Sequence, residues 1–564
     1  MKKINLSIAV VLISILLSNI YAVDYYVTTS GLVSNDGLSW ANAMTLNAAL
    51  AVAQDDDVIH IGAGTFVPAD YITGGTLEED KTFEIKSNVA LIGGYPANPI
   101  SGDNPSDDHV TIFNGNETYY HVVAVTAPAA SGKKISIDNV TITGGNAAAS
   151  GAATLTINAL SFVRINGSAM IIGGAVVEIN NSKIINNKSR SHTPGVYAFS
   201  NADVTVNNCL VENNVGQSTA GNGASFWFAS STLRVNNSSI IGNKNSGVGA
   251  IQIITNSKGY FYNTTISQNV AGLGSATTSR NGSGIYVRDG SQVQVVNCTI
   301  YGNESNGNGA GIALHTSNVT TLPNTLEVIS STITGNKSLL LNPSTAGIFA
   351  LTAGCTINIH NSIVSGNTAL GANNHDAAVT STSVLTPKKS TIGVKMYDGD
   401  AVEVADKSFI AATMLDALAN NGGATQTCKL LLDEETNTAF TMGMTSAALQ
   451  SLGGILTPAV PDNIVMYDQL GNQRAGTVMG AWIANGPFSN TIQVSEKQQP
   501  VAYADQNGIV VHTKTSDRVV VFNITGQRVF DTTAKGDVTR IDNQLRKGNV
   551  YIVNVNGQNS KVLF

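Results

Sequence analysis

Short runs of alternating apolar and polar residues recur along the chain between residues 170 and 370. Seven segments share an alternating entry that ends at an anchor Asn or Ser, an aliphatic residue three positions later and an Asn six positions later. They are VEINNSKIINN, VTVNNCLVENN, LRVNNSSIIGN, GYFYNTTISQN, VQVVNCTIYGN, LEVISSTITGN and INIHNSIVSGN. Their anchors, 26 to 34 residues apart, are Asn181, Asn208, Asn237, Asn263, Asn297, Ser330 and Asn361. The period of two residues predicts short β-strands.

A further strand begins at a glycine upstream of five of these anchors, in GVYAF, GASFW, GIYVR, GIALH and GIFAL. A unit of about 30 residues with three short strands and no helix cannot close a core alone, so it must stack on its copies. We therefore predict an all-β chain built on a right-handed parallel β-helix, with one coil per unit and three long parallel sheets. VALIGGY, VTIFNGN, HVVAV and ISIDNVTITGG extend the pattern upstream, which gives about ten to twelve coils.

Two kinds of residue are expected to form rows along this solenoid. Alternate apolar residues, such as Val177 and Ile179, should face inward as aliphatic stacks. The second Asn of each unit should lie at a bend, adopt a left-handed backbone conformation and hydrogen-bond to its equivalent in the next coil. These residues are Asn187, Asn214, Asn243, Asn269, Asn303, Asn336 and Asn367. We predict that this row is structural.

The N-terminal end of the solenoid has its own pattern. Residues 39–54, SWANAMTLNAALAVAQ, carry apolar residues with a helical period, which predicts a helix that caps the open end. Asp55, Asp56 and Asp57 follow this segment. No set of further ligands at calcium-binding spacing comes after them, so a solvated turn is favoured over a metal site.

The pattern divides the chain into four parts. Residues 1–22 combine two lysines, an apolar run and a small final residue, which predicts a signal peptide, with a retained membrane anchor as the alternative. Residues 23–485 hold the β-helix with its N-terminal cap, and residues 486–500 form a polar linker. Residues 501–564 contain alternating strands with N-G and T-G turns, which predict a small antiparallel β-sandwich.

Composition excludes several classes of partner. The chain is 12% charged with a net charge of -7, so it has neither a nucleic-acid footprint nor a polybasic membrane patch. After signal removal no segment is long and apolar enough to span a bilayer. Four widely spaced cysteines, Cys209, Cys298, Cys355 and Cys428, favour isolated buried thiols over a disulfide framework and show no zinc pattern.

Two sets of motifs resemble known families. GLSWANAMTLNAALAVAQDDDVIHIGAGTFVP, LIGGY and the I-x-x-N and G-A-G-I segments resemble bacterial surface proteins of the right-handed parallel β-helix, or pectin-lyase-like, class. Among these they are most similar to the set with polymorphic-outer-membrane-protein repeats, although Ile or Val replaces most of its Phe residues. NITGQRVF, LRKGNVYIVNVNG and the terminal K-V resemble the type IX secretion sorting domain. This second resemblance implies passage across the outer membrane and, often, removal of the tail.

The acidic residues of the repeats do not form a pattern typical of a catalytic site. Hydrolysis of glycosidic bonds requires two carboxylates about 5 to 9.5 Å apart. The acidic residues of the repeat region lie at scattered positions of the unit, and Glu178 and Glu327 share a position but stand five coils apart. We therefore assign no catalytic residue, no cofactor and no metal, while a site assembled from loops stays open.

One set of side chains is predicted to line an exterior sheet. Residues two and four positions after each unit glycine should point outward, and aromatic rings along a flat face suit stacking on sugars or on a partner protein. The set comprises Tyr197, Phe199, Trp227, Tyr286, Arg288, His315 and Phe349. The alternatives are that a loop or the tail covers these residues, or that they only fill the surface. Asp289 and His315 are weak acid/base candidates.

The leading functional hypothesis is an exported, non-catalytic surface protein, an adhesin or a platform that binds a glycan or a cell-surface protein. Its C-terminal domain would engage the secretion machinery, and its location would be secreted or attached to the outer membrane of a Gram-negative bacterium. A polysaccharide lyase or glycoside hydrolase acting on acidic glycans is the first alternative. A purely structural spacer is the second. Ligand, oligomeric state and the fate of the tail are left open.

Overall fold

The computed structural model describes residues 22–483 and 502–563 with short gaps, so the predicted signal segment lies outside the described residues. The gaps fall at 129, 131, 148–152, 191, 218–222, 273–280, 319–321, 341–343, 371–373, 381–382, 393–394, 398–406, 409–414, 432–436, 475, 506–507, 524–526, 537, 542–544, 546–549 and 556–557. The chain divides into two compact units, Met1–Asn485 and Gly486–Phe564.

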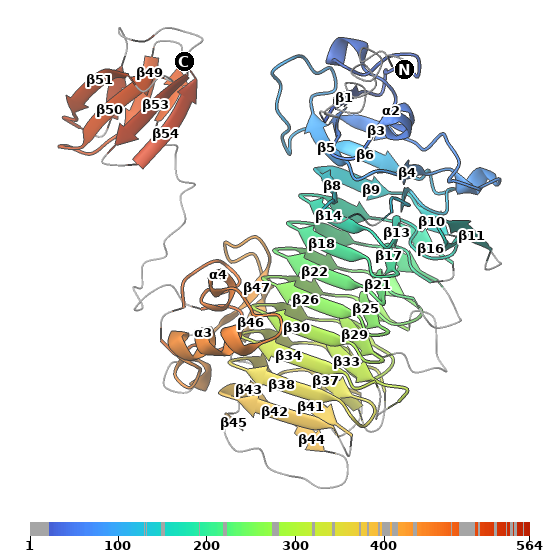
Figure 1. Cartoon of the computed structure of the whole chain (residues 1–564). Helices are drawn as coiled ribbons and strands as arrows, with labels where there is room; N and C mark the ends of the chain where they lie inside the picture. The colour runs from blue at the N-terminus through green and yellow to red at the C-terminus, as the bar shows by residue number, and fades with distance from the viewer. Residues whose placement is uncertain are drawn as a thin grey trace, which may run out of the picture. The chain divides into compact units, whose positions relative to one another are not determined.

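The first unit is a right-handed parallel β-helix, as predicted (Figure 1). Two of its sheets have twelve strands each, which pair in parallel from coil to coil. The first sheet contains β1 (Asp24–Val27), β2 (Val58–Gly62), β5 (Ala90–Tyr95), β8 (Ile135–Asp138), β14 (Val176–Asn180), β18 (Asp203–Asn207), β22 (Thr232–Asn236), β26 (Lys258–Tyr262), β30 (Gln292–Val296), β34 (Thr325–Ile329), β38 (Thr356–His360) and β42 (Val384–Lys388). The second sheet contains β3 (Gly64–Phe66), β6 (Thr111–Asn114), β9 (Val140–Thr143), β15 (Lys183–Ile185), β19 (Leu210–Glu212), β23 (Ser239–Ile241), β27 (Thr265–Ser267), β31 (Thr299–Tyr301), β35 (Thr332–Thr334), β39 (Ile363–Val364), β43 (Ser390–Ile392) and β45 (Lys407–Ser408).

A third sheet has eleven strands and a fourth, unpredicted sheet has eight. The third sheet contains β4 (Phe83–Ile85), β7 (Val123–Val125), β13 (Met170–Gly173), β17 (Val196–Phe199), β21 (Phe226–Ala229), β25 (Ile251–Ile254), β29 (Ile285–Arg288), β33 (Ile312–His315), β37 (Ser344–Ala350), β41 (Asn374–Val379) and β44 (Lys395–Tyr397). The fourth contains β10 (Asn146–Ala147), β16 (Lys188–Ser189), β20 (Val215–Gly216), β24 (Lys244–Asn245), β28 (Val270–Ala271), β32 (Glu304–Ser305), β36 (Lys337–Ser338) and β40 (Thr368–Ala369). Strands of two residues are too short to leave a period in the sequence.

The core follows the predicted inward rows. Val177 and Ile179 are fully buried, and their equivalents in neighbouring coils, such as Val204 and Val206, stack on them in register. One aliphatic cluster runs through the coils from Val27 to Leu385. Burial of whole Val, Leu and Ile side chains contributes about 1.5 to 3 kcal/mol each, so this cluster is the main stabilising term of the solenoid.

The second Asn of each unit forms a continuous buried ladder. The Nδ2 atom of each donates to the Oδ1 atom of the next at 2.8 to 3.0 Å, from Asn187 to Asn367. The ladder ends on the Oδ1 atom of Asp376, 2.8 Å from Asn367. The predicted hydrogen bonding is therefore confirmed, but the predicted left-handed conformation is wrong. Positive φ falls on the preceding residue, such as Asn186 and Asn213, because the chain turns there and the next side chain must point inward.

The N-terminal cap is a short helix, α2 (Leu46–Val52), preceded by the 3-10 turn η1 (Trp40–Asn42). The hydroxyl of Thr45 caps α2 by accepting from the backbone N–H of Ala48. The predicted helix is thus confirmed in its centre but is shorter. The expected solvated turn is wrong for Asp57, which is 1% exposed and accepts from two backbone N–H groups. The cap region also contains η2 (Glu78–Asp80) and the antiparallel hairpin of β11 (Thr154–Ile157) and β12 (Leu160–Val163).

Residues 415–483 do not continue the coils. This cover segment folds back along the outside of the β-helix, where α3 lies beside β30 and β34 (Figure 1). It contains β46 (Leu415–Ala419), β47 (Thr427–Leu430), η4 (Thr438–Phe440), α3 (Ser446–Ile455) and α4 (Asp462–Val465). Leu449, Val460 and Val465 of the segment pack on Val296 and Ile329 of the first sheet.

The second unit is built from two antiparallel sheets. One contains β48 (Ala502–Asp505), β49 (Gly508–His512) and β52 (Val538–Ile541); the other contains β51 (Arg528–Thr533), β50 (Arg518–Asn523), β53 (Val550–Val555) and β54 (Gln558–Leu563). Ile509 and Val511 from one sheet share a core with Val521 and Val553 from the other. This arrangement matches the predicted antiparallel sandwich.

The four cysteines are free and buried. Burial raises the pKa of the Cys209 and Cys298 thiols to about 12, so they carry no thiolate at neutral pH. Across the part of the chain that the structure describes, no helix is both long and apolar enough for a bilayer span.

Replacing Asn269 by Ala should lower the free energy of unfolding by about 2 to 4 kcal/mol, because buried ladder partners lose their hydrogen bonds. Asn269 donates to Ile240 O and Asn303 Oδ1 and accepts from Asn243. Chemical denaturation followed by circular dichroism measures the change. The exposed Asn104→Ala variant is the matched control, and equal stability of the two variants would contradict a stabilising ladder.

Candidate functional site

A row of left-handed residues marks the corner between the first and second sheets. This corner row consists of Asn139, Asn181, Asn208, Asn237, Asn263, Asn297, Ser330 and Asn361, all with φ between 48° and 55°. Asn tolerates this backbone conformation better than most residues. Because each coil contributes one residue at the same position, the side chains align along the solenoid.

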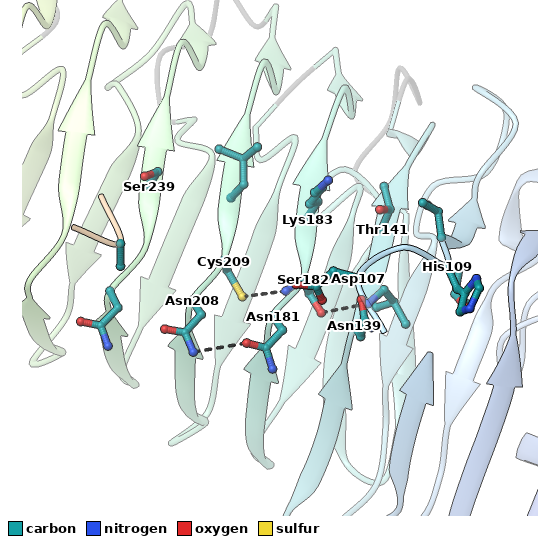
Figure 2. A pocket seen from close by; sticks show the side chains of 16 residues that line it. Asp107, His109, Asn139, Thr141, Asn181, Ser182, Lys183, Asn208, Cys209 and Ser239 are labelled. Carbon is teal, nitrogen blue, oxygen red and sulfur yellow. Dashed lines mark hydrogen bonds between the residues drawn. The ribbon is translucent and has the colours of Figure 1, made fainter. Parts of the chain in front are cut away.

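The side chains of the corner row are linked to one another. Asn208 Nδ2 donates to Asn181 Oδ1 at 3.2 Å (Figure 2). Asn181 Nδ2 donates in turn to Asp138 Oδ1 at 2.9 Å. A second row of carboxamides lies one residue earlier, where Asn207 donates to Asn180 and Asn236 donates to Asn207 at 2.9 and 2.8 Å. Asn-Asn doublets in three successive coils therefore make an amide-rich surface.

The corner row is covered in its C-terminal half. Asn297, Ser330 and Asn361 are fully buried beneath the cover segment. The carboxamide of Asn297 donates to Ile464 O at 2.6 Å, and that of Asn361 donates to Val478 O at 3.2 Å. Main-chain groups of the cover segment thus satisfy the corner side chains.

Arg474 fastens the cover segment to this corner. Its Nη2 donates to Asn297 Oδ1 at 3.0 Å and to Gly480 O at 2.8 Å, and its Nε donates to Tyr467 O at 3.0 Å. Burial lowers the pKa of Arg474 to about 10, opposed by the charge of Asp468. The guanidinium therefore stays protonated at neutral pH.

The N-terminal half of the row lies open in a groove of about 460 Å³ (Figure 2). Its floor carries Asn139, Asn181, Asn208 and Asn237, flanked on the second sheet by Thr141, Lys183, Leu210 and Ser239. Asp107 and His109, from the loop between β5 and β6, line one end, and Ala424 of the cover segment also lines the groove. The lining is mostly polar and uncharged, with a single carboxylate.

The sequence itself marks the boundary between the two halves. The last residues of the first-sheet strands are Asp138, Asn180, Asn207 and Asn236 in the open coils, and Tyr262, Val296, Ile329 and His360 in the covered coils. The apolar residues pack against the cover segment. The cover segment therefore docks where this register position changes from amide to mainly apolar side chains, and the groove stays open where the position carries amides.

The residues predicted for the aromatic face lie on the third sheet. In-register pairing puts Tyr197, Trp227, Tyr286 and Phe349 in one outward row, interrupted by Gln252 and Ala313. Phe199, Arg288 and His315 belong to the adjacent outward row. The register therefore aligns these side chains, and their role in binding stays a prediction.

The predicted open surface is wrong for two of these rings. Phe199 is 8% exposed and packs edge-on against Phe162 of the β11–β12 hairpin. Tyr286 is also 8% exposed and packs with Val248 and Ala313. Strand alternation places such residues outward, but it does not reveal which hairpin or turn folds over them.

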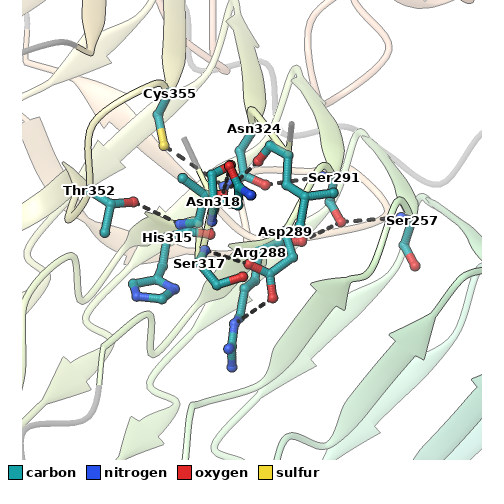
Figure 3. A network of polar contacts seen from close by, with 12 residues as sticks. Ser257, Arg288, Asp289, Ser291, His315, Ser317, Asn318, Asn324, Thr352 and Cys355 are labelled. Atoms are coloured by element: carbon teal, nitrogen blue, oxygen red, sulfur yellow. Dashed lines mark hydrogen bonds and ion pairs between the residues drawn. The ribbon is translucent and has the colours of Figure 1, made fainter. Parts of the chain in front are cut away.

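Arg288, Asp289 and His315 meet in a polar network around a turn (Figure 3). Arg288 Nε lies 2.9 Å from Asp289 Oδ2, and Asp289 Oδ1 accepts from the Ser317 backbone N–H at 2.7 Å. Burial and then the charge of Arg288 lower the pKa of His315. Both Asp289 oxygens are thus engaged in holding the turn, which leaves this carboxylate poorly placed for proton transfer.

The structure does not bring the carboxylates of Glu178 and Glu327 together. The pairing register confirms that they share one row five coils apart. Glu178 pairs with Lys134 at 2.7 Å, and Glu327 accepts from Asn358 at 2.7 Å. Among the described residues no cluster of three or more His, Cys, Asp or Glu side chains could hold a metal ion.

Sequence reasoning missed the open groove. The Asn-Asn doublets at 180/181, 207/208 and 236/237 were its available signal, because turn formation requires only one of the two residues. The loop with Asp107 and His109 carries no repeat and could not be placed from periodicity.

No protein-family model matches the chain, and no curated protein matches it either. Among solved structures it is similar to pectate lyase Pel9A, at 14% identity and a TM-score of 0.38 over 76% of this chain and 93% of that one. It is also similar to a rhamnogalacturonan lyase, at 14% identity and a TM-score of 0.35 over 73% and 96%. A third similar structure is XylC in complex with xylose, at 9% identity and a TM-score of 0.36 over 81% and 98%. These likenesses concern the fold alone.

Replacing Arg474 by Ala should release the cover segment without unfolding the coils, because its carbonyl and carboxamide partners lose their donor. Hydrogen exchange of the α3 amides should become faster by about tenfold or more, while the buried strand β30 keeps its protection. Lys429→Ala, at an exposed position of β47, is the control. Unchanged exchange in α3 would show that Arg474 does not hold the segment.

Proposed function

We propose that this chain is an exported, non-catalytic surface protein whose β-helix binds a linear polymer, a glycan or a protein segment, in the open corner groove. The observation that carries the proposal is the polar corner row that continues beyond the cover segment and stays accessible over Asn181 and Asn208. A purely structural spacer has no need for carboxamides that line an open groove in successive coils.

The sequence patterns at both ends support export. Residues 1–22 resemble a secretory signal, and residues 501–564 resemble a type IX secretion sorting domain. In this proposal the C-terminal unit engages the secretion machinery, and the β-helix reaches the outer surface of a Gram-negative bacterium. The aromatic row of the third sheet, through Trp227, is a second surface available to a ligand, since that side chain is only partly buried.

Blocking the groove should weaken binding while the fold stays intact. In Ser239→Arg a long cationic side chain enters the groove from a partly buried position of the second sheet that flanks it. Fluorescently labelled full chain is applied to immobilised pectin, alginate and glycosaminoglycans and to a random peptide library displayed on phage. We expect wild-type binding to at least one probe, weakened about tenfold or more by this change.

Ser161→Arg, at an exposed position of the β11–β12 hairpin, is the matched control and should bind as the wild type does. Circular dichroism and thermal melting establish that both variants are folded. Equal binding by all three proteins to every probe would reject the groove as the binding site.

A polysaccharide lyase is the second candidate, favoured by one observation: Asp107, His109 and Lys183 line the same groove. A lyase needs a base and a group that stabilises the developing negative charge. Hydrolysis is disfavoured, because the groove lining contains one carboxylate where two are required.

We expect no ultraviolet-absorbing unsaturated products from polygalacturonate or alginate incubated with the full chain. Product formation is compared between the wild type and the Lys183→Ala variant. Product formation by the wild type that disappears in this variant would make the chain a lyase and overturn the non-catalytic proposal.

A further inference from the structure

The corner row is one feature with two different surroundings. Its side chains at Asn297 and Asn361 are fully buried by the cover segment, whereas Asn181 and Asn208 are exposed. Backbone conformation is the same in both halves, with φ between 48° and 54° at these four residues. The covered half therefore shows what kind of chemical group this row accommodates.

The groups that contact the covered carboxamides belong mainly to peptide bonds. Asn297 donates to the carbonyl of Ile464 at 2.6 Å. Asn361 donates to the carbonyl of Val478 at 3.2 Å and accepts from the N–H of Met444 at 2.8 Å. The Asn361 carboxamide thus bonds to a main-chain carbonyl and to a main-chain N–H at the same time, because it has both a donor and an acceptor.

The open carboxamides keep the capacity for such contacts. A carboxamide has two N–H groups and two acceptor lone pairs, and a bond along the row uses only one of each. Asn297 shows that both uses are compatible, because it also donates to Asn263 Oδ1 at 3.2 Å. Asn208 makes the equivalent row bond to Asn181.

We propose that the open half of the corner row binds an extended polypeptide segment of a partner protein, whose main chain takes the place that the cover segment takes in the covered half. The inference rests on the proposed binding function of the groove and adds the class of ligand. The groove is continuous with an interface that the chain already forms with peptide groups. Its lining contains no Trp, Tyr or Phe side chain, so it offers no aromatic platform for a sugar ring.

The length of the groove limits the segment. Four coils at about 4.8 Å spacing extend over about 14 Å, which corresponds to about four residues of extended chain. Such a short contact requires several main-chain hydrogen bonds, and losing two carboxamides should weaken it about tenfold or more.

The test selects peptides from a random phage-displayed library against the full chain and measures the chosen synthetic peptide by fluorescence anisotropy. The test variant is Asn181→Gly with Asn208→Gly, because glycine keeps the left-handed backbone and removes only the carboxamides. Asn201→Gly is the matched control, since Asn201 is exposed with φ 63° at a different corner. A glycan array is probed with the same proteins.

We expect a selected peptide whose affinity falls about tenfold or more in the double variant and stays unchanged in Asn201→Gly. If glycans bind through these two carboxamides and no peptide does, the ligand class is wrong while the binding function stands. If neither probe binds in a manner that depends on them, both the inference and the proposed function are overturned. Thermal melting of each variant separates lost binding from lost folding.

Discussion

The buried ladder of carboxamides fixes the register on which every surface of the β-helix depends. Each amide from Asn187 to Asn367 has its hydrogen-bond partner in the neighbouring coil. A coil that slipped by one residue would leave a buried amide without a partner, at a cost of about 1 to 3 kcal/mol, and would turn its aliphatic residues outward. Because the ladder holds the coils in register, equivalent residues lie directly above one another. The chemical character of each surface row therefore depends on which residue each coil has at that position.

That rule explains how one sequence builds both a docking surface and an open groove. At the end of the first-sheet strands, Asn236 is followed one coil later by Tyr262 and then by Val296. Apolar side chains at this position would expose a patch, which the cover segment buries with Leu449 and Val465. Where the position carries Asn, the polar side chain can stay in contact with water or a polar ligand, and the cover segment does not bury it.

Local patterns of the chain sufficed to predict the repeats, the inward rows and the buried amide ladder, since each follows from a period of two residues and a unit that must stack. They did not suffice where distant segments meet. Strand alternation correctly predicted that Phe199 points outward. It could not predict that the β11–β12 hairpin, a separate insertion, packs over this ring through Phe162. The docking of Arg474 against Asn297 joins residues 177 positions apart and has no local signal. The left-handed residue was misplaced by one position because a turn and its neighbouring inward side chain share the same Asn-rich sequence.

The same regularity bears on what the molecule can do. A pair of catalytic acids requires two carboxylates that converge, whereas Glu178 and Glu327 lie in one row five coils apart. A repeated amide row suits a polymer instead. Coils recur every 4.8 Å or so and an extended chain every 3.3 Å or so, so that about two coils match three residues. In the covered half, Asn297 and Asn361 donate to the carbonyls of Ile464 and Val478, which belong to two separate stretches of the cover segment. In the open groove Asn181 and Asn208 lie exposed in adjacent coils, so both carboxamides are available to the main chain of a bound segment.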